Sequence, residues 1–361
     1  MSSTVRIGLI GTQGYAEMMH IRSIQSHQSA RLVAICGRNR QRAADLAEFY
    51  GIDHVFTDYR EMLGSGKLDA VVIAAPDRLH YPMALAALEA GLHTVCEKPL
   101  ANTAGQAYDL YQKAQAAGVV NMVPFTWSWM PLNHLVRQLV QDGYIGSLYQ
   151  AEFRLIANFG LYPHYSWKFD PLLSDGVVSD FGLHMFHLSR LFCGEASRVF
   201  GWLSSHIRHE SQDGTKLESQ NDRATVLLAY ENGGQGTIQL STVAGADTKV
   251  ENSVCLYGSE GTLEMKINGG KQGKLLGKRK NEQALQPIEV PTDWYGPLTK
   301  GAVAFDYFWK LSQEMPVGDR AFIDAIVNQC PLEPNFQDGW KAQQILDAAI
   351  QSHRTESWVN L

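Results

Sequence analysis

The sequence predicts an α/β protein in which a doubly wound parallel sheet is followed by a second α+β domain with a large, open-faced, mostly antiparallel sheet. Two observations lead to this prediction. Short apolar segments in the first 125 residues alternate with segments of helical period. After residue 125, apolar and polar residues alternate with a period of two in many segments, which is typical of antiparallel strands. We therefore expect one domain over residues 1–124 and another over 125–361, with the final helix packing back on the first.

The first domain is expected to contain five strands joined by four helices. The strands are expected at 5–11, 31–37, 68–76, 93–99 and 119–125, and the helices at 15–26, 40–50, 80–90 and 103–117. Continuous apolar strands linked by helices form a parallel sheet covered on both faces. Ligands of such a sheet bind at the carboxyl ends of its strands.

The second domain is expected to pack helices on one face of an open sheet. Helices are expected near 131–142 and 180–193, and strands at 150–159, 199–207, 223–230, 234–243, 253–258 and 261–267. The polar segments 209–221 and 268–286 are interpreted as inserted loops, and a long helix is expected to begin within 334–339.

Composition excludes several classes of function. The 361 residues, 45% of them apolar, can form two domain cores. A formal charge of −6 with scattered basic residues gives no site for nucleic acid or an anionic membrane. The sequence has no signal-peptide pattern and no apolar stretch long enough to span a bilayer, so we expect a cytoplasmic protein. Five widely spaced cysteines are interpreted as buried apolar residues rather than disulfide partners or metal ligands.

A glycine-rich turn follows the first predicted strand. In the dinucleotide fingerprint G-x-G-x-x-G/A, Gly11 takes the first position, Gln13 the second and Ala16 the third. The turn opens a helix whose N-terminus can bind phosphate, which predicts a dinucleotide-binding Rossmann domain. The alternative is a glycine-rich turn in another kind of α/β protein. The residues expected to contact the cofactor here are Gly11, Thr12, Gln13, Gly14 and Tyr15.

The end of the second strand bears on the choice of cofactor. Proteins that bind NAD usually place an acidic residue here for the ribose hydroxyl, whereas arginine suits the 2′-phosphate of NADP. The chain has Gly37 and Arg38 at this point and no acidic residue. We therefore slightly favour NADP over NAD, the alternative being that Arg38 is a surface residue.

Several segments along the whole chain match one family pattern. They are AAPDRLHYPMALAALEAGLHTVCEKPLA at 74–101, WKFDP at 167–171, DGVVSDFGLH at 175–184, PNFQDG at 334–339 and SWVNL at 357–361. The sequence thereby resembles the glucose-fructose oxidoreductase, inositol dehydrogenase and rhizopine catabolism (Gfo/Idh/MocA) family. The resemblance implies an NAD(P)-dependent oxidoreductase of sugars, inositols or related polyols. It also implies a homodimer or homotetramer formed through the C-terminal sheet.

The resemblance implies that Lys98 is the catalytic residue. Hydride transfer from an alcohol requires a group that takes the hydroxyl proton, and a lysine whose pKa is lowered by its surroundings can do so. The alternative is a surface lysine paired with Glu97. Glu97 is interpreted as positioning the lysine or contacting the cofactor. Ala75, Pro76 and His80 correspond to the family segment near the nicotinamide.

Asp180 and His184 are four residues apart and are expected on one helical face. The resemblance implies that both bind substrate hydroxyls and that His184 shares in proton transfer. The alternatives are a helix cap for Asp180 and a core position for His184. His187 stands where the family usually has aspartate, but we expect no metal site.

Three further residues are expected to bind substrate. Lys168 matches a basic position of the family, with a solvated lysine as the alternative. Trp127 and Trp167 can contact the C–H faces of a sugar ring, or they can belong to the core.

Two other functions remain open at this point. One is an NAD-dependent glycosidase that oxidises its substrate transiently, and the other is a non-catalytic dinucleotide-binding sensor.

Overall fold

The computed structural model describes residues 4–211, 213–217, 220–245, 250–268, 273–296 and 304–361. The chain divides into two compact units. The first contains Met1–Phe125 and Phe308–Gln343, and the second contains Thr126–Tyr307 and Gln344–Leu361. The division of roles that we expect between a cofactor domain and a substrate domain stays a prediction. Within the part of the chain that the structure describes, no helix combines the length and apolarity needed to cross a membrane.

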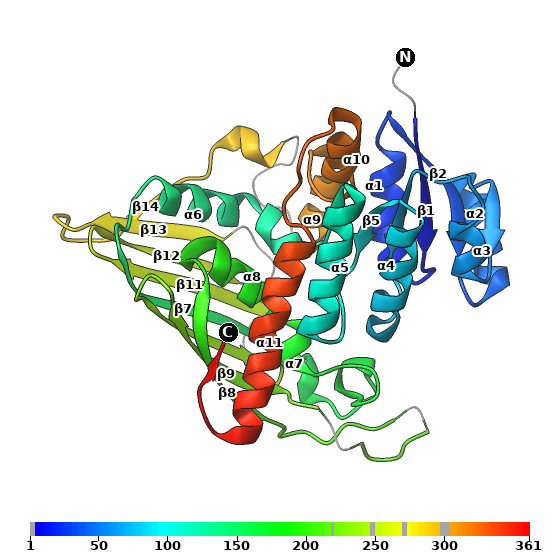
Figure 1. Ribbon diagram of the computed structural model, residues 1–361. Helices are drawn as coiled ribbons and strands as arrows, with labels where there is room; N and C mark the ends of the chain where they lie inside the picture. The colour runs from blue at the N-terminus through cyan, green and yellow to red at the C-terminus, as the bar shows by residue number, and fades with distance from the viewer. Residues whose placement is uncertain (1–3, 212, 218–219, 246–249, 269–272, 297–303) are drawn as a thin grey trace. The chain divides into compact units, whose positions relative to one another are not determined.

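The first unit is built on a six-stranded parallel sheet, which confirms the predicted fold class (Figure 1). Its strands are β1 (Val5–Ile10), β2 (Ala30–Cys36), β3 (His54–Phe56), β4 (Ala70–Ile73), β5 (His93–Cys96) and β6 (Asn121–Met122). The order in the sheet is β3-β2-β1-β4-β5-β6, and every neighbouring pair is parallel. The order in which successive strands are added therefore reverses between β1 and β4, which is where such sheets bind dinucleotides.

Helices cover this sheet. They are η1 (Ala16–Ile21), α1 (Arg22–Gln25), α2 (Arg40–Tyr50), α3 (Tyr59–Leu63), η2 (Asp77–Leu79), α4 (His80–Glu89), α5 (Ala104–Ala117), α9 (Ala304–Glu314), α10 (Asp319–Asn328) and α11 (Phe336–Thr355). Capping residues and glycines in the sequence define where several of these helices begin and end. Asn39 and Thr103 accept backbone N–H bonds as the N-caps of α2 and α5, and Gly51 and Gly118 end these helices in left-handed conformations. Helix α10 packs against α1, β1 and β5 (Figure 1).

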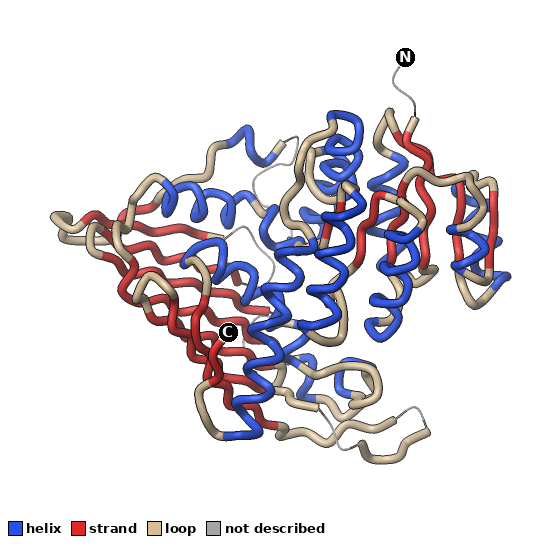
Figure 2. The backbone as a smooth tube through the Cα atoms, in the orientation of Figure 1, coloured by secondary structure: helices blue, strands red, loops and turns tan. Residues whose placement is uncertain are grey.

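The second unit is built on a nine-stranded mixed sheet, drawn as neighbouring red strands in Figure 2. Its strands are β7 (Leu148–Ala157), β8 (Ala196–Ser204), β9 (Arg223–Tyr230), β10 (Gln235–Ser241), β11 (Val250–Gly258), β12 (Gly261–Asn268), β13 (Lys274–Arg279), β14 (Gln286–Pro287) and β15 (Val359–Asn360). The order is β14-β13-β12-β11-β7-β10-β9-β8-β15. Only β7 and β10 run parallel among these described neighbours.

The interpretation of 268–286 as a loop is wrong for its central part, which forms β13. This strand pairs with β12 along its whole length, and its inward residues are Leu275 and Gly277. Leu275 is the single apolar side chain that points inward, and lysines lie on both sides of the segment. The alternation of apolar and polar residues therefore extends over too few residues to be recognised in the sequence. Residues 269–272 of this segment lie outside the described part of the chain, as do 212 and 218–219 of the other predicted loop.

The second unit also contains helices. They are η3 (Thr126–Trp129), α6 (Pro131–Gln141), η4 (Phe159–Leu161), η5 (Trp167–Phe169), α7 (Val177–Asp180), α8 (Gly182–Cys193) and η6 (Thr292–Tyr295). Of these, α7 and α8 pack on the sheet of this unit. Helix α8 is buried along most of its length and contacts α6 and β7. The end of α11 lies so close to β8 that a Cβ on Gly201 would lie 2.3 Å from the Ala349 carbonyl oxygen. Glycine at this position therefore permits the helix to pack on the strand.

Candidate active site

The glycine-rich turn leaves the carboxyl end of β1 and opens η1. Gly11 has φ of +131°, and a Cβ there would lie 2.3 Å from the carbonyl oxygen of Ala74. Only glycine fits this backbone, so the strand can turn sharply beside β4. Gln13, which stands at the second glycine position of the fingerprint, is exposed, and Gly14 has open space where a Cβ would be. The turn therefore leaves room at its outer side for a pyrophosphate group.

The end of β2 lies against the same turn. The Gly11 N–H donates to the Cys36 carbonyl at 2.9 Å, and a Cβ on Gly37 would lie 2.5 Å from Thr12 Cγ2. Gly37 thus allows the turn and the strand end to approach closely. Arg38 follows with an exposed side chain, where it is accessible to a ligand at this edge of the sheet.

The end of β4 continues into Ala75, Pro76 and His80. The His80 ring is 1% exposed, and its Nδ1 and Nε2 lie 2.6 Å and 2.8 Å from the carbonyl oxygens of Pro99 and Ala75. Carbonyl oxygens accept but do not donate, so both ring nitrogens must carry protons to satisfy this arrangement. Burial lowers the pKa of His80, but Cys96 and the Pro99 carbonyl outweigh it and raise the pKa to about 10. His80 therefore ties the ends of β4 and β5 together, and neither ring nitrogen is left to bind a cofactor.

The end of β5 carries Glu97 and Lys98. Glu97 is 7% exposed, and its Oε2 accepts the backbone N–H of Lys98 at 3.2 Å. Lys98 is half-buried and is joined to Pro99 by a cis peptide bond. A lysine at the carboxyl end of a central parallel strand stands where this class of sheet binds its ligands.

A buried histidine contacts Glu97 from the other side. His20 of η1 is 2% exposed, and its Nε2 lies 3.3 Å from Glu97 Oε1. Its Nδ1 lies 2.9 Å from Asp319 Oδ2 at the start of α10. Burial lowers the pKa of His20, but the Asp319 and Glu97 carboxylates outweigh it and raise the pKa to about 10. His20 is therefore a buried imidazolium at neutral pH.

In the second unit, the structure brings together two of the predicted substrate-binding residues. Lys168 Nζ lies 2.5 Å from Asp180 Oδ2, and the lysine also lies over the rings of Phe159 and Trp167 at 5.2 Å and 6.0 Å. Asp180 is the last residue of α7, and the N-cap of α8 is Phe181. Capping of α8 therefore does not account for Asp180, whose carboxylate is held by an ammonium group.

His184 lies in the first turn of α8. Its ring stacks on Trp127 with 5.7 Å between centroids and an angle of 27° between planes. His187, one turn later, is fully buried, and burial followed by the charges of Arg190 and Arg137 lowers its pKa well below the ordinary value. His187 is therefore neutral. Among the described residues there is no group of three or more His, Cys, Asp or Glu side chains placed to hold a metal ion.

The predicted aromatic residues are not part of a core. Trp167 is 44% exposed, and Trp127 is only partly buried. These aromatic faces are therefore available to a ligand, as the substrate-binding interpretation requires.

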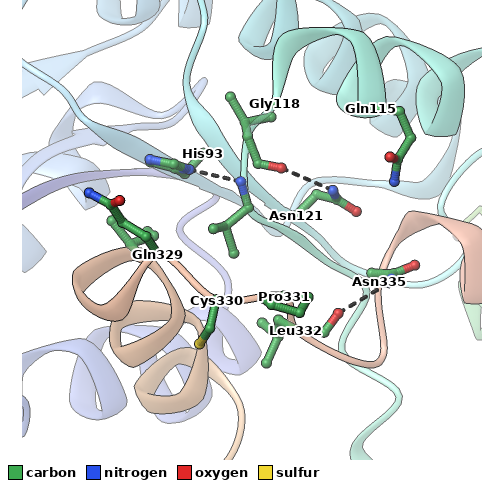
Figure 3. A pocket seen from close by; sticks show the side chains of 12 residues that line it. His93, Gln115, Gly118, Asn121, Gln329, Cys330, Pro331, Leu332 and Asn335 are labelled. Carbon is green, nitrogen blue, oxygen red and sulfur yellow. Dashed lines mark hydrogen bonds between the residues drawn. The ribbon is translucent and has the colours of Figure 1, made fainter.

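A separate pocket of about 530 Å³ lies in the first unit, at the amino ends of strands β5 and β6 (Figure 3). Its walls include His93 and Asn121, which are the first residues of β5 and β6, together with Asn335. The His93 Nδ1 accepts the N–H of Val120 at 2.9 Å. Cys330, which we expected to be buried, is exposed and lines this pocket. Because parallel sheets bind ligands at the carboxyl ends of their strands, this pocket is not the predicted cofactor site.

Sequence reasoning missed His20 and Asp319. They are separated by 299 residues and belong to no motif, so spacing gave no signal that they meet. A lone histidine in the first helix is usually a core residue, and only the fold shows that this one contacts Glu97.

Comparison with known proteins supplies independent information. A family model described as an oxidoreductase family with an NAD-binding Rossmann fold matches residues 5–125, and a GFO/IDH/MocA C-terminal domain model matches residues 134–264. A levoglucosan dehydrogenase from Pseudarthrobacter phenanthrenivorans is 25% identical, over 91% of this chain and 88% of that protein. A D-glucoside 3-dehydrogenase from Escherichia coli is 28% identical, over 100% of this chain and 98% of that protein.

The fold is shared with a solved structure. A levoglucosan dehydrogenase in complex with NADH and levoglucosan superimposes with a TM-score of 0.87 at 22% identity, covering 99% of both chains. At this level of identity the similarity establishes the fold alone.

Proposed function

This chain belongs to the Gfo/Idh/MocA oxidoreductase family, and from that premise we propose that it transfers a hydride between a nicotinamide dinucleotide and a secondary alcohol or carbonyl of a sugar, inositol or related polyol. The observation that carries the proposal is the position of Lys98. It follows a central parallel strand, beside a buried carboxylate and near the turn that is shaped for a dinucleotide. The D-glucoside and levoglucosan dehydrogenases named above act on compounds of this class.

Each residue has a defined role in this proposal. The nicotinamide ring supplies the hydride acceptor or donor when the cofactor is bound. Lys98 takes the hydroxyl proton during oxidation and returns it during reduction. Asp180 accepts a hydrogen bond from a substrate hydroxyl, and Lys168 keeps that carboxylate charged and oriented. His184, with its ring fixed against Trp127, takes part in the proton transfer.

The open face of the second sheet supports a further part of the proposal. Trp202 of β8 is 66% exposed, and Leu227 of the paired strand β9 lies on the same face at 36% exposure. We propose that a second copy of the chain covers this face, giving a homodimer or homotetramer in the cytoplasm.

The function can be tested directly with the purified protein. We expect formation of reduced nicotinamide, followed by ultraviolet absorbance, with at least one member of a panel of pyranosides, anhydro-sugars, inositols and linear polyols. Controls omit the polyol or the dinucleotide. If bound nucleotide is oxidised and reduced without net turnover while a glycosidic bond is cleaved, the transient-oxidation alternative is correct and this proposal is wrong.

Arg38 is expected to set a preference for NADPH over NADH. Replacing Arg38 with alanine should weaken NADPH binding by roughly 10- to 100-fold, because a charge-assisted hydrogen bond contributes about 1.5–3 kcal/mol. NADH binding should be unchanged. Isothermal titration calorimetry of both nucleotides measures this. Arg31→Ala is the matched control, because Arg31 lies near the amino end of the same strand and pairs with Asp53. Equal binding of both nucleotides by the wild type would show that Arg38 is only a surface residue.

A further inference from the structure

A buried row of three charged groups leads from α10 to the proposed catalytic lysine. Asp319, His20 and Glu97 are 4%, 2% and 7% exposed, and they contact in that order. His20 Nδ1 faces both Asp319 oxygens, at 2.9 Å and 3.1 Å, and His20 Nε2 faces Glu97 Oε1 at 3.3 Å. All three residues belong to the first unit.

Protonation of His20 places a cation between the two carboxylates of this row. A neutral imidazole would direct a lone pair at one of the two carboxylates, whereas an imidazolium forms a hydrogen bond with Asp319 and an ion pair with Glu97, whose Oε1 lies near Nε2 outside hydrogen-bond geometry. Two carboxylates without a cation between them would be costly to bury. The charged groups that face His20 are Asp319 from α10 and Glu97 from the end of β5, and the titratable Tyr15 ring of the glycine turn lies 6.1 Å away.

The arrangement fixes both oxygens of Glu97. Oε1 faces the His20 ring, and Oε2 accepts the backbone N–H of Lys98. The plane of the carboxylate is therefore set by a buried ring on one side and by the backbone of the lysine on the other. His20 is in turn held by Asp319, whose charge is favoured at the first residue of the ten-residue helix α10.

We propose that His20 is a positioning residue of the active site, which Asp319 holds in place and which orients Glu97 beside Lys98. This inference depends on the proposed function, in which Lys98 transfers the proton. His20 does not contact the reacting atoms in this scheme. It acts through Glu97, and Asp319 acts through His20.

The chain contains a matched control for the test. His27 is also buried, and its Nε2 lies 3.0 Å from Asp324 Oδ1 of the same helix α10. This pair joins the segment after α1 to α10, but it does not contact Glu97. His27→Gln therefore removes a similar histidine–carboxylate contact between neighbouring elements without altering the charge beside Lys98.

The experiment compares His20→Gln, Asp319→Asn and His27→Gln in the full-length protein, using a polyol that the wild type oxidises. We expect His20→Gln to lower kcat at least about tenfold with little change in the KM for polyol. Loss of the buried cation makes the surroundings of Lys98 more negative by one charge, so the acid limb of the kcat/KM profile should move to higher pH, by about one unit. Asp319→Asn removes the carboxylate that holds the His20 ring and should also lower kcat, whereas His27→Gln should leave both kcat and the pH profile in place.

A second measurement does not require turnover. The ¹⁵N chemical shifts of the His20 ring, assigned by comparison with His20→Gln, should show both nitrogens protonated at neutral pH. A neutral ring at pH 7 would overturn the inference, as would a His20→Gln variant whose pH profile matches that of His27→Gln. Failure of the proposed function is recognised separately, because the wild type would then show no polyol-dependent turnover or Lys98 variants would be fully active.

Discussion

Replacing Lys98 with methionine is expected to lower kcat for polyol oxidation by about 10²- to 10⁴-fold, the contribution of a positioned general acid or base. Methionine keeps the length and much of the apolar stem of lysine but cannot accept or return a proton. Because Lys98 is half-buried at a strand end, the substitution leaves the packing of β5 intact. Dinucleotide binding should change little, so the loss should appear in kcat rather than in cofactor affinity.

Steady-state kinetics with saturating cofactor, together with calorimetry of the nucleotide, measures this prediction. Lys67→Met is the control, since Lys67 is an exposed lysine that lies before the amino end of β4, whereas Lys98 lies at the carboxyl end of β5. A Lys98→Met variant with wild-type kcat would exclude Lys98 as the proton-transfer residue and would move attention to His184.

The sequence predicted the parallel sheet well because its strands are continuous apolar segments closed by glycine turns. The predicted helices at 40–50 and 103–117 match α2 and α5 almost to the residue, since each has a side-chain cap at its start and a glycine at its end. The strand β3 was missed because it has three residues, too few for any pattern. Helix α3, with five residues, was missed for the same reason.

The site was predictable only as far as its motifs extend. The spacing within WKFDP and DGVVSDFGLH identified Lys168 and Asp180 separately, and the fold shows that their charged groups are in contact. The contact between His20, Asp319 and Glu97 joins three distant parts of the chain, and no local pattern encodes it. The contacts of the buried His80 ring with two backbone carbonyls were likewise not encoded in its motif, and its place beside the cofactor stays a prediction.

The stability of the protein is expected to be greatest near pH 6.5 and to fall on both sides of it. His20 and His80 have folded-state pKa values of about 10, against an ordinary value of 6.5. Between pH 6.5 and about 10 the folded state keeps protons that the unfolded state has released. The stabilisation that the two protonated histidines give to the folded state is therefore fully present below pH 6.5, and it is lost as the pH rises toward 10. Each histidine lowers the free energy of unfolding by about 1.4 kcal/mol per pH unit in this window.

His187 lowers the stability of the folded state at acid pH. Its folded-state pKa lies well below 6.5, so the unfolded state binds a proton that the buried ring does not, and stability falls as the pH drops below 6.5. Urea denaturation of the wild type at several pH values from about 5 to 9 measures both limbs. Because His80 alone remains in a His20→Gln variant, its free energy of unfolding should fall between pH 7 and 9 with about half the slope of the wild type. An equal slope in the two proteins would mean that His20 is not protonated in the folded state, which would contradict the presence of a cation between Asp319 and Glu97.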